Sequence, residues 1–211
     1  MMIHAYDELY LDSAQRLLGD AFDYALMTLQ MEPELFQEIF LHSLASRQFA
    51  GGNPSYVAGI TGCEFVRKIV KESGLELDFA EDAMYVDKSP EYWAGWALAY
   101  YQWLRCCSFR KVLEIVPIVR IIEMYPTFHE IDIQGFVAAI DERIRQRYRS
   151  NLAQLRERVG ISVSDLSKNA DISIKQLEAL EQGEKELGKL QASTLYRLSR
   201  ALHCSMEELM Y

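Results

Sequence analysis

The 211-residue sequence is poor in the residues that interrupt helices, with only five prolines and eleven glycines. Because these two residues punctuate turns, their scarcity favours helices over a β architecture with many turns. Long apolar runs are also missing. The longest, residues 93–101, is far shorter than the roughly 18 residues of a membrane span. No secretory signal is visible in residues 1–10. We therefore expect an all-α protein of the cytoplasm that does not enter membranes.

Recognisable catalytic and metal-binding motifs are absent as well. The four histidines are scattered, and the glycine-containing stretch 51–62 lacks the Gly-Lys-Ser/Thr of a phosphate-binding loop. No serine lies in a Gly-x-Ser-x-Gly turn. We therefore expect no enzyme, no cofactor and no metal site; an enzyme within residues 1–140 is retained as an alternative.

The cysteines show neither a Cys-x-x-Cys pair nor the spacing of metal ligands. In a chain without an export signal we expect them to be reduced thiols in the core. The adjacent Cys106 and Cys107 fit either a redox-active pair or two apolar thiols at a helix end. The four residues are Cys63, Cys106, Cys107 and Cys204.

Charge is distributed unevenly along the chain, whose net charge is −9. Residues 1–140 carry 10 basic and 20 acidic residues, 141–150 four arginines and two acidic residues, and 151–211 eight basic and nine acidic residues. This asymmetry predicts an acidic helical domain, an arginine-rich helical connector and a separate C-terminal domain over these three ranges. The connector arginines contact either phosphate groups or only solvent. They are Arg143, Arg145, Arg147 and Arg149.

Apolar spacing predicts the helices of the N-terminal domain. They cover residues 7–30, 34–43, about 63–70, two short stretches within 109–125 separated by Pro117, and 131–149, with a loop at 74–88. The strongest start signal is Ser89-Pro90-Glu91, with a capping serine and a proline at the first helical position. The helix that follows contains all three tryptophans of the chain. It is either a central core helix or a binding surface.

Five short helices with clear start and stop signals are predicted over residues 151–211. Gly160 follows the first of them, as is common at helix C-termini. Ser162 and Ser173 each open a helix with a polar side chain three residues later, which is typical of a capping box. Residues 170–172 form a tight turn between the second and third helices, which is the helix-turn-helix arrangement.

A family resemblance extends over this whole C-terminal segment. The stretches that carry it read LRERVGISVSDL (155–166), ADIS (170–173), LEALEQG (177–183), LYRLSRAL (195–202) and SMEEL (205–209). Residues 152–210 thereby resemble the Cro/repressor helix-turn-helix family, also called XRE-like. The resemblance implies a five-helix, lambda-repressor-like DNA-binding domain whose third helix enters the major groove.

The resemblance also implies which residues contact DNA. Lys175 is suited to donate to guanine and Ile174 to pack on a thymine methyl group. Ser162 and Ser173, at helix N-termini, suit phosphate groups. The predicted DNA-binding residues are Ser162, Val163, Ser164, Ser173, Ile174, Lys175, Gln176 and Ala179.

Other positions match the scaffold of that family. Arg156 and Glu181 occupy positions that form an internal salt bridge in it, so we predict a structural role for this pair. The expected small core consists of Leu155, Leu166, Ala170, Ile172, Leu177, Leu180, Leu195, Leu198 and Leu202.

Two functions follow from these patterns. The first is a transcriptional regulator, expected to be a repressor, that binds double-stranded DNA as a homodimer while residues 1–140 sense a signal, dimerise or bind a partner. The second is an antitoxin-like protein whose acidic domain neutralises a toxin-like protein partner and whose C-terminal domain represses the shared operon. The segment SPEYWAGWALAYYQW (89–103) resembles bacterial regulators found beside toxin–antitoxin genes.

Overall fold

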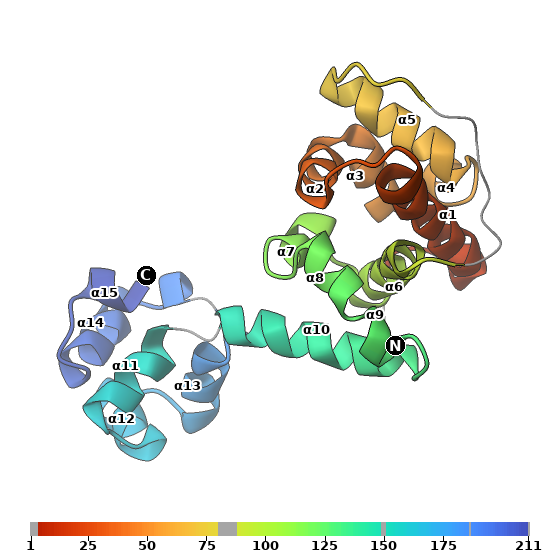
Figure 1. Ribbon diagram of the computed structural model, residues 1–211. Helices are drawn as coiled ribbons and strands as arrows, with labels where there is room; N and C mark the ends of the chain where they lie inside the picture. The colour runs from red at the N-terminus through yellow and green to blue at the C-terminus, as the bar shows by residue number, and fades with distance from the viewer. Residues whose placement is uncertain (1–3, 80–87, 149–150, 186, 211) are drawn as a thin grey trace. The chain divides into compact units, whose positions relative to one another are not determined.

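The protein, seen in a computed structural model, is described over residues 4–79, 88–148, 151–185 and 187–210. These residues form α-helices, two short 3-10 segments and one π-helical turn, and contain no β-strand. The all-α prediction is therefore confirmed. The chain divides into two compact units, Met1–Asp141 and Glu142–Tyr211 (Figure 1). No helix in the described ranges is both long and apolar enough to span a membrane.

Helices α1 (Leu11–Asp23) and α6 (Pro90–Arg105) form the centre of the N-terminal unit and pack closely on each other. At Gly95 of α6 the two backbones approach so closely that a Cβ atom would overlap the carbonyl oxygen of Leu18. The same Cβ would lie 2.9 Å from Cγ of Phe22. Glycine is therefore required at this point of the helix pair.

Other helices of the unit complete its core. Phe40 of α2 has ring contacts with Phe22, Phe36, Phe65 and Phe109 at centroid distances of 4.9–6.4 Å. These helices are α2 (Pro33–His42), α3 (Leu44–Ala50), α4 (Pro54–Val57), α5 (Gly62–Ser73), α7 (Phe109–Leu113), α8 (Ile118–Glu123), α9 (Tyr125–Phe128) and α10 (Ile133–Tyr148).

Helix α6 begins as predicted. The backbone N–H of Tyr92 donates to Oγ of Ser89 at 2.9 Å, and Pro90 occupies the first helical position. Three of its aromatic residues are buried, so the core-helix interpretation holds for them; the other three reach the surface. The buried ones are Trp93, Tyr101 and Trp103, and the partly exposed ones Tyr92, Trp96 and Tyr100.

Several local predictions need correction. The helix expected over 7–30 consists of a 3-10 turn (Glu8–Tyr10), α1 and a π-helical turn (Tyr24–Thr28). Pro126 lies in the first turn of α9, where the missing N–H of proline costs no hydrogen bond. Residues 74–79 and 88 are outside helices, as predicted for the loop 74–88; residues 80–87 lie outside the described ranges.

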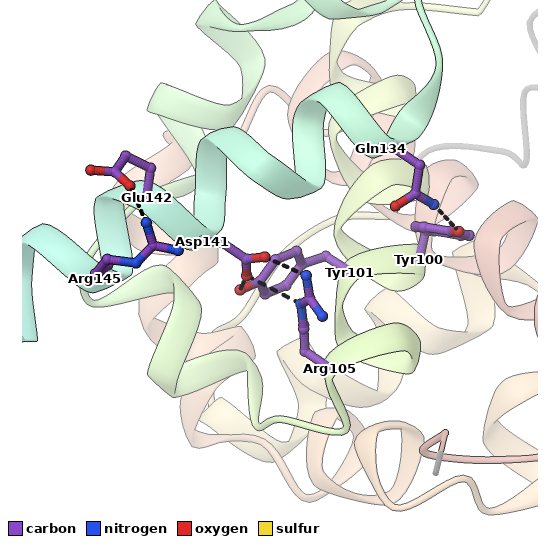
Figure 2. A network of polar contacts seen from close by, with 7 residues as sticks. All are labelled: Tyr100, Tyr101, Arg105, Gln134, Asp141, Glu142 and Arg145. Carbon is purple, nitrogen blue, oxygen red and sulfur yellow. Dashed lines mark hydrogen bonds and ion pairs between the residues drawn. The ribbon is translucent and has the colours of Figure 1, made fainter. Parts of the chain in front are cut away.

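Polar contacts attach α10 to α6 (Figure 2). The hydroxyl of Tyr101 donates to Asp141 at 2.8 Å, and Arg105 forms an ion pair with the same carboxylate. Burial and the hydrogen bond to Asp141 both raise the pKa of Tyr101, which keeps this hydroxyl a donor. Gln134 donates to the hydroxyl of Tyr100 at 2.8 Å. The first part of α10 is thus fixed to the N-terminal unit by side chains as well as by packing.

The arginines of the predicted connector lie on or just beyond α10. Arg145 pairs with Glu142 on the same helix at 2.8 Å, and both side chains are at least half exposed. For Arg145 this favours the solvated interpretation, because its charge is already paired within the helix on a face open to solvent. Arg149 and the side chain of Arg147 lie outside the described residues.

The expectation that all cysteines lie in the core is wrong. Cys106 is exposed, and the other three are partly exposed. Cys106 ends α6 in the left-handed conformation (φ 47°). A residue pattern along the chain shows that Cys106 lies near a helix end, but not that this end lies at the surface.

Cys107 is expected to react slowly with iodoacetamide at pH 8. Burial raises the pKa of its thiol from 9.0 to about 11, and only the thiolate is nucleophilic. Its alkylation at pH 8 should therefore be roughly 100-fold slower than that of an exposed thiol with a pKa of 9.0 and should accelerate up to about pH 11. Peptide mass spectrometry of the Cys106→Ser variant measures this rate. Equal rates at pH 8 would contradict the prediction and favour the redox-active alternative.

The C-terminal unit contains the five predicted short helices. Its core contains every residue expected from the sequence, although Ile172 and Leu195 are only partly buried, and it also includes Leu152 and Leu209. The helices are α11 (Asn151–Val159), α12 (Val163–Ala170), α13 (Ile174–Glu181), α14 (Ala192–Ala201) and α15 (Met206–Met210), with a 3-10 turn at Leu187–Lys189.

Candidate nucleic-acid interface

The turn between α12 and α13 is held by contacts from both sides. Asp171 ends α12 in the left-handed conformation (φ 56°), which aspartate tolerates better than most residues. The buried Ser167 donates its hydroxyl to the carbonyl of Ile172 at 2.6 Å. Arg197 of α14 pairs with the Asp171 carboxylate at 2.8 Å. The roles of Ser167 and Arg197 were not predicted, because both depend on contacts with residues outside their own helices.

The serine N-cap bond of the predicted capping box is present at both helix starts, but the return bond from the third residue to the capping backbone is not found among the described contacts. The backbone N–H of Asp165 donates to Oγ of Ser162 at 3.1 Å, and that of Gln176 donates to Oγ of Ser173 at 3.2 Å. The Ser162 hydroxyl also donates to the Asp165 carboxylate at 2.6 Å. An acidic side chain therefore lies in the first turn of α12, whereas the first turn of α13 has none. The start of α13 is thus better suited to an anion than the start of α12.

The eight predicted DNA-binding residues differ in their exposure to solvent. Ile174 is 47% exposed although it is apolar. Val163 packs against the core, so its side chain is partly withdrawn from solvent. The exposed residues are Ser162, Ser164, Ser173, Ile174 and Lys175, and the partly buried ones are Val163, Gln176 and Ala179.

Lys175 is the cation nearest the start of α13 in sequence. It lies in the first turn of the helix, is exposed, and forms no ion pair with any described residue. By contrast, Arg156 and Arg197 are both paired with carboxylates. Lys175 therefore keeps its three donors available for a ligand.

The Arg156–Glu181 pair is scaffold, as the family resemblance implied. Nε and Nη2 of Arg156 donate to the two carboxylate oxygens of Glu181 at 2.6 and 3.0 Å. Nη1 donates to the carbonyl of Ile161 at 3.3 Å. The two side chains are only 15% and 10% exposed. The bidentate pair fixes α11 against α13 from inside the domain.

Five short helices with a helix-turn-helix at α12–α13 define a DNA-binding domain. Residues 151–211 match the family model of the Cro/C1-type HTH DNA-binding domain. This segment is therefore a Cro/C1-type domain, and the family prediction for it is confirmed. No curated protein and no solved structure was found to match the chain.

The N-terminal unit is outside the matched segment. Its resemblance to regulators beside toxin–antitoxin genes stays a prediction. Among the described residues, no three His, Cys, Asp or Glu side chains are grouped so that they could hold a metal ion.

Proposed function

We propose that the protein is a sequence-specific transcriptional repressor that binds double-stranded DNA as a homodimer in the cytoplasm. The observation that carries the proposal is that Lys175, exposed in the first turn of α13 within a Cro/C1-type domain, has no ion pair with any residue that the structure describes. In this proposal α13 lies in the major groove, and the N-terminal unit acts by interaction and not by catalysis.

The residues at the helix starts have distinct proposed roles. Lys175 donates to the O6 and N7 acceptors of a guanine, and the exposed Ile174 packs on a thymine methyl group. Ser164 and Ser173 lie near the backbone phosphates, where the N–H groups of the helix starts add to the attraction. The contribution of Val163 is confined to positioning, since it is packed against the core.

Dimerisation is proposed because one domain alone attracts DNA weakly. Residues 151–211 carry eight basic and nine acidic residues, and nonspecific affinity grows with the number of phosphates neutralised. Two domains reading half-sites roughly 34 Å apart would combine their binding free energies on a palindromic site.

Titration of the full-length protein against the DNA upstream of its own gene tests the proposal. A scrambled duplex of the same composition is the control, and two salt concentrations separate phosphate attraction from base readout. Preference for the upstream DNA is the expected result. Equal binding to both duplexes, or none, would contradict sequence-specific repression.

Replacing Lys175 by alanine is expected to weaken binding to the preferred DNA by about 1–3 kcal/mol and to relax sequence preference at one base pair. The physical reason is the loss of the donor to guanine. Fluorescence anisotropy with single-base variants of the site measures both effects. The matched control is Lys111→Ala, which removes an exposed lysine from α7 in the other unit. Unchanged affinity in the Lys175→Ala variant would show that α13 does not read DNA through this residue.

A further inference from the structure

The N-terminal unit has a cavity of about 310 Å³ whose wall is mostly aromatic. Tyr92, Trp93 and Trp96 of α6 form one side of it. The other side comes from α9 and the start of α10 and includes Tyr125 and Phe128. Sites for small molecules commonly have volumes of roughly 300–1,000 Å³, apolar walls and a few polar groups. This cavity therefore has the size of a site for a molecule with one or two rings.

The tryptophans of the wall have unused hydrogen-bonding capacity. Among the residues that the structure describes, neither Trp93 nor Trp96 has a partner for its indole N–H. Trp103, which does not line the cavity, donates its indole N–H to the carbonyl of Tyr6 at 2.9 Å. An indole N–H is a donor only, so a ligand that satisfies it must offer an acceptor.

The charged groups at the cavity also favour an acceptor. Nζ of Lys88 lies 3.8 Å from the centre of the Tyr92 ring, directly on the wall. Its ion pair with Asp20 is long, 3.6 Å, and its side chain is 52% exposed. Such a pair holds the ammonium weakly, and beside its hydrogen bonds to Asp20 and Tyr92 the ammonium keeps one donor for a ligand. On the opposite side, Nε2 of His129 lies 3.5 Å from the exposed carboxylate of Glu130.

We propose that this cavity binds a small aromatic carboxylate, with its ring among Trp93, Trp96 and Phe128 and its carboxylate at Lys88. Flat aromatic walls favour a ring over an aliphatic chain, because offset and edge-to-face ring pairs add to the gain from area burial. The ammonium of Lys88 favours an anionic over a cationic ligand, because Lys88 lines the cavity whereas the carboxylates of Asp20 and Glu130 do not. This site is independent of the proposed DNA binding and can be tested without DNA.

The test compares three probes that share one ring and differ in charge: phenylacetate, benzyl alcohol and phenethylamine. Isothermal titration calorimetry of the full-length protein gives each affinity, and tryptophan fluorescence gives a second readout because Trp93 and Trp96 line the cavity. Phenylacetate is expected to bind with a Kd of about 1 mM or tighter. Benzyl alcohol and phenethylamine should bind at least about tenfold more weakly.

Variants locate the site. Trp96→Ala should weaken phenylacetate binding by about tenfold or more, and Lys88→Gln should remove the preference for phenylacetate over benzyl alcohol. Leu104→Ala, a partly buried position of α6 outside the cavity, is the control and should bind like the unchanged protein. Because Lys88 is half exposed, its variant should fold even if Trp96→Ala does not. Absence of phenylacetate binding, equal binding of phenethylamine, or an unaffected Lys88→Gln variant would overturn the proposal.

Discussion

Replacing Glu181 by glutamine is expected to destabilise the DNA-binding domain by about 3 kcal/mol. The carboxylate accepts two hydrogen bonds from Arg156, and the two side chains are only 10% and 15% exposed. Glutamine has nearly the same shape but no charge, so the largely buried guanidinium of Arg156 would keep only the more distant, half-exposed carboxylate of Glu157, at 3.9 Å, as a counter-ion. A domain of about 60 residues is marginally stable, so most of its stability and, with it, DNA binding should be lost.

Hydrogen–deuterium exchange of the full-length protein measures this effect on the domain alone. Amides of α11–α14 should exchange about a hundredfold faster in the variant, whereas α1 and α6 should be unaffected. The matched control is Glu178→Gln, an exposed position one turn earlier on α13. It removes the same charge and should change exchange by less than about threefold. If the amides of Glu181→Gln exchange as slowly as those of the control, the Arg156–Glu181 pair contributes little to the stability of the domain.

A double variant distinguishes the effect of losing the whole ion pair from the effect of leaving one of its charges unpaired. Arg156→Met combined with Glu181→Leu removes both charges and fills their volume with apolar side chains. Replacing a buried ion pair in this way is often neutral or stabilising, because no unpaired charge remains. We expect slow exchange to return in the double variant.

Replacing Gly95 by alanine is expected to destabilise the N-terminal unit by about 3 kcal/mol, near the upper end of the usual cost of overpacking. The added Cβ would overlap the carbonyl oxygen of Leu18 and approach the ring of Phe22. The backbone carbonyl cannot rotate away as a side chain can, so α1 and α6 must separate. This cost exceeds the gain of about 1 kcal/mol from replacing glycine by alanine within a helix.

Urea unfolding followed by tryptophan fluorescence measures this change, because all three tryptophans lie on α6. The midpoint should fall by roughly 1–3 M. Gly135→Ala on α10 is the matched control: its Cβ would meet mainly the end of the exposed Ile131 side chain, which can move. The control should leave stability unchanged or raise it by about 0.5 kcal/mol. An unchanged midpoint for Gly95→Ala would show that the two helices do not need this close approach.

The sequence by itself determined the helical class and the DNA-binding domain. Helix starts such as Ser89-Pro90, Ser162 and Ser173 could be predicted because capping depends on residues only a few positions apart. The Arg156–Glu181 pair could be predicted only through the family resemblance, since nothing local joins two residues 25 positions apart.

Only the tertiary structure decided how the N-terminal unit is arranged. Three of its features bring together residues that are distant in sequence: the close approach at Gly95, the contact of Tyr101 with Asp141 across 40 positions, and the aromatic cavity. The exposure of Cys106 likewise depends on which segments pack beside it. The aromatic pattern of α6 fitted both a core and a surface. The neighbouring helices settled this for each residue, because they cover Trp93 and leave Trp96 partly open. Periodicity shows which residues share a helix face, but burial depends on what packs against that face.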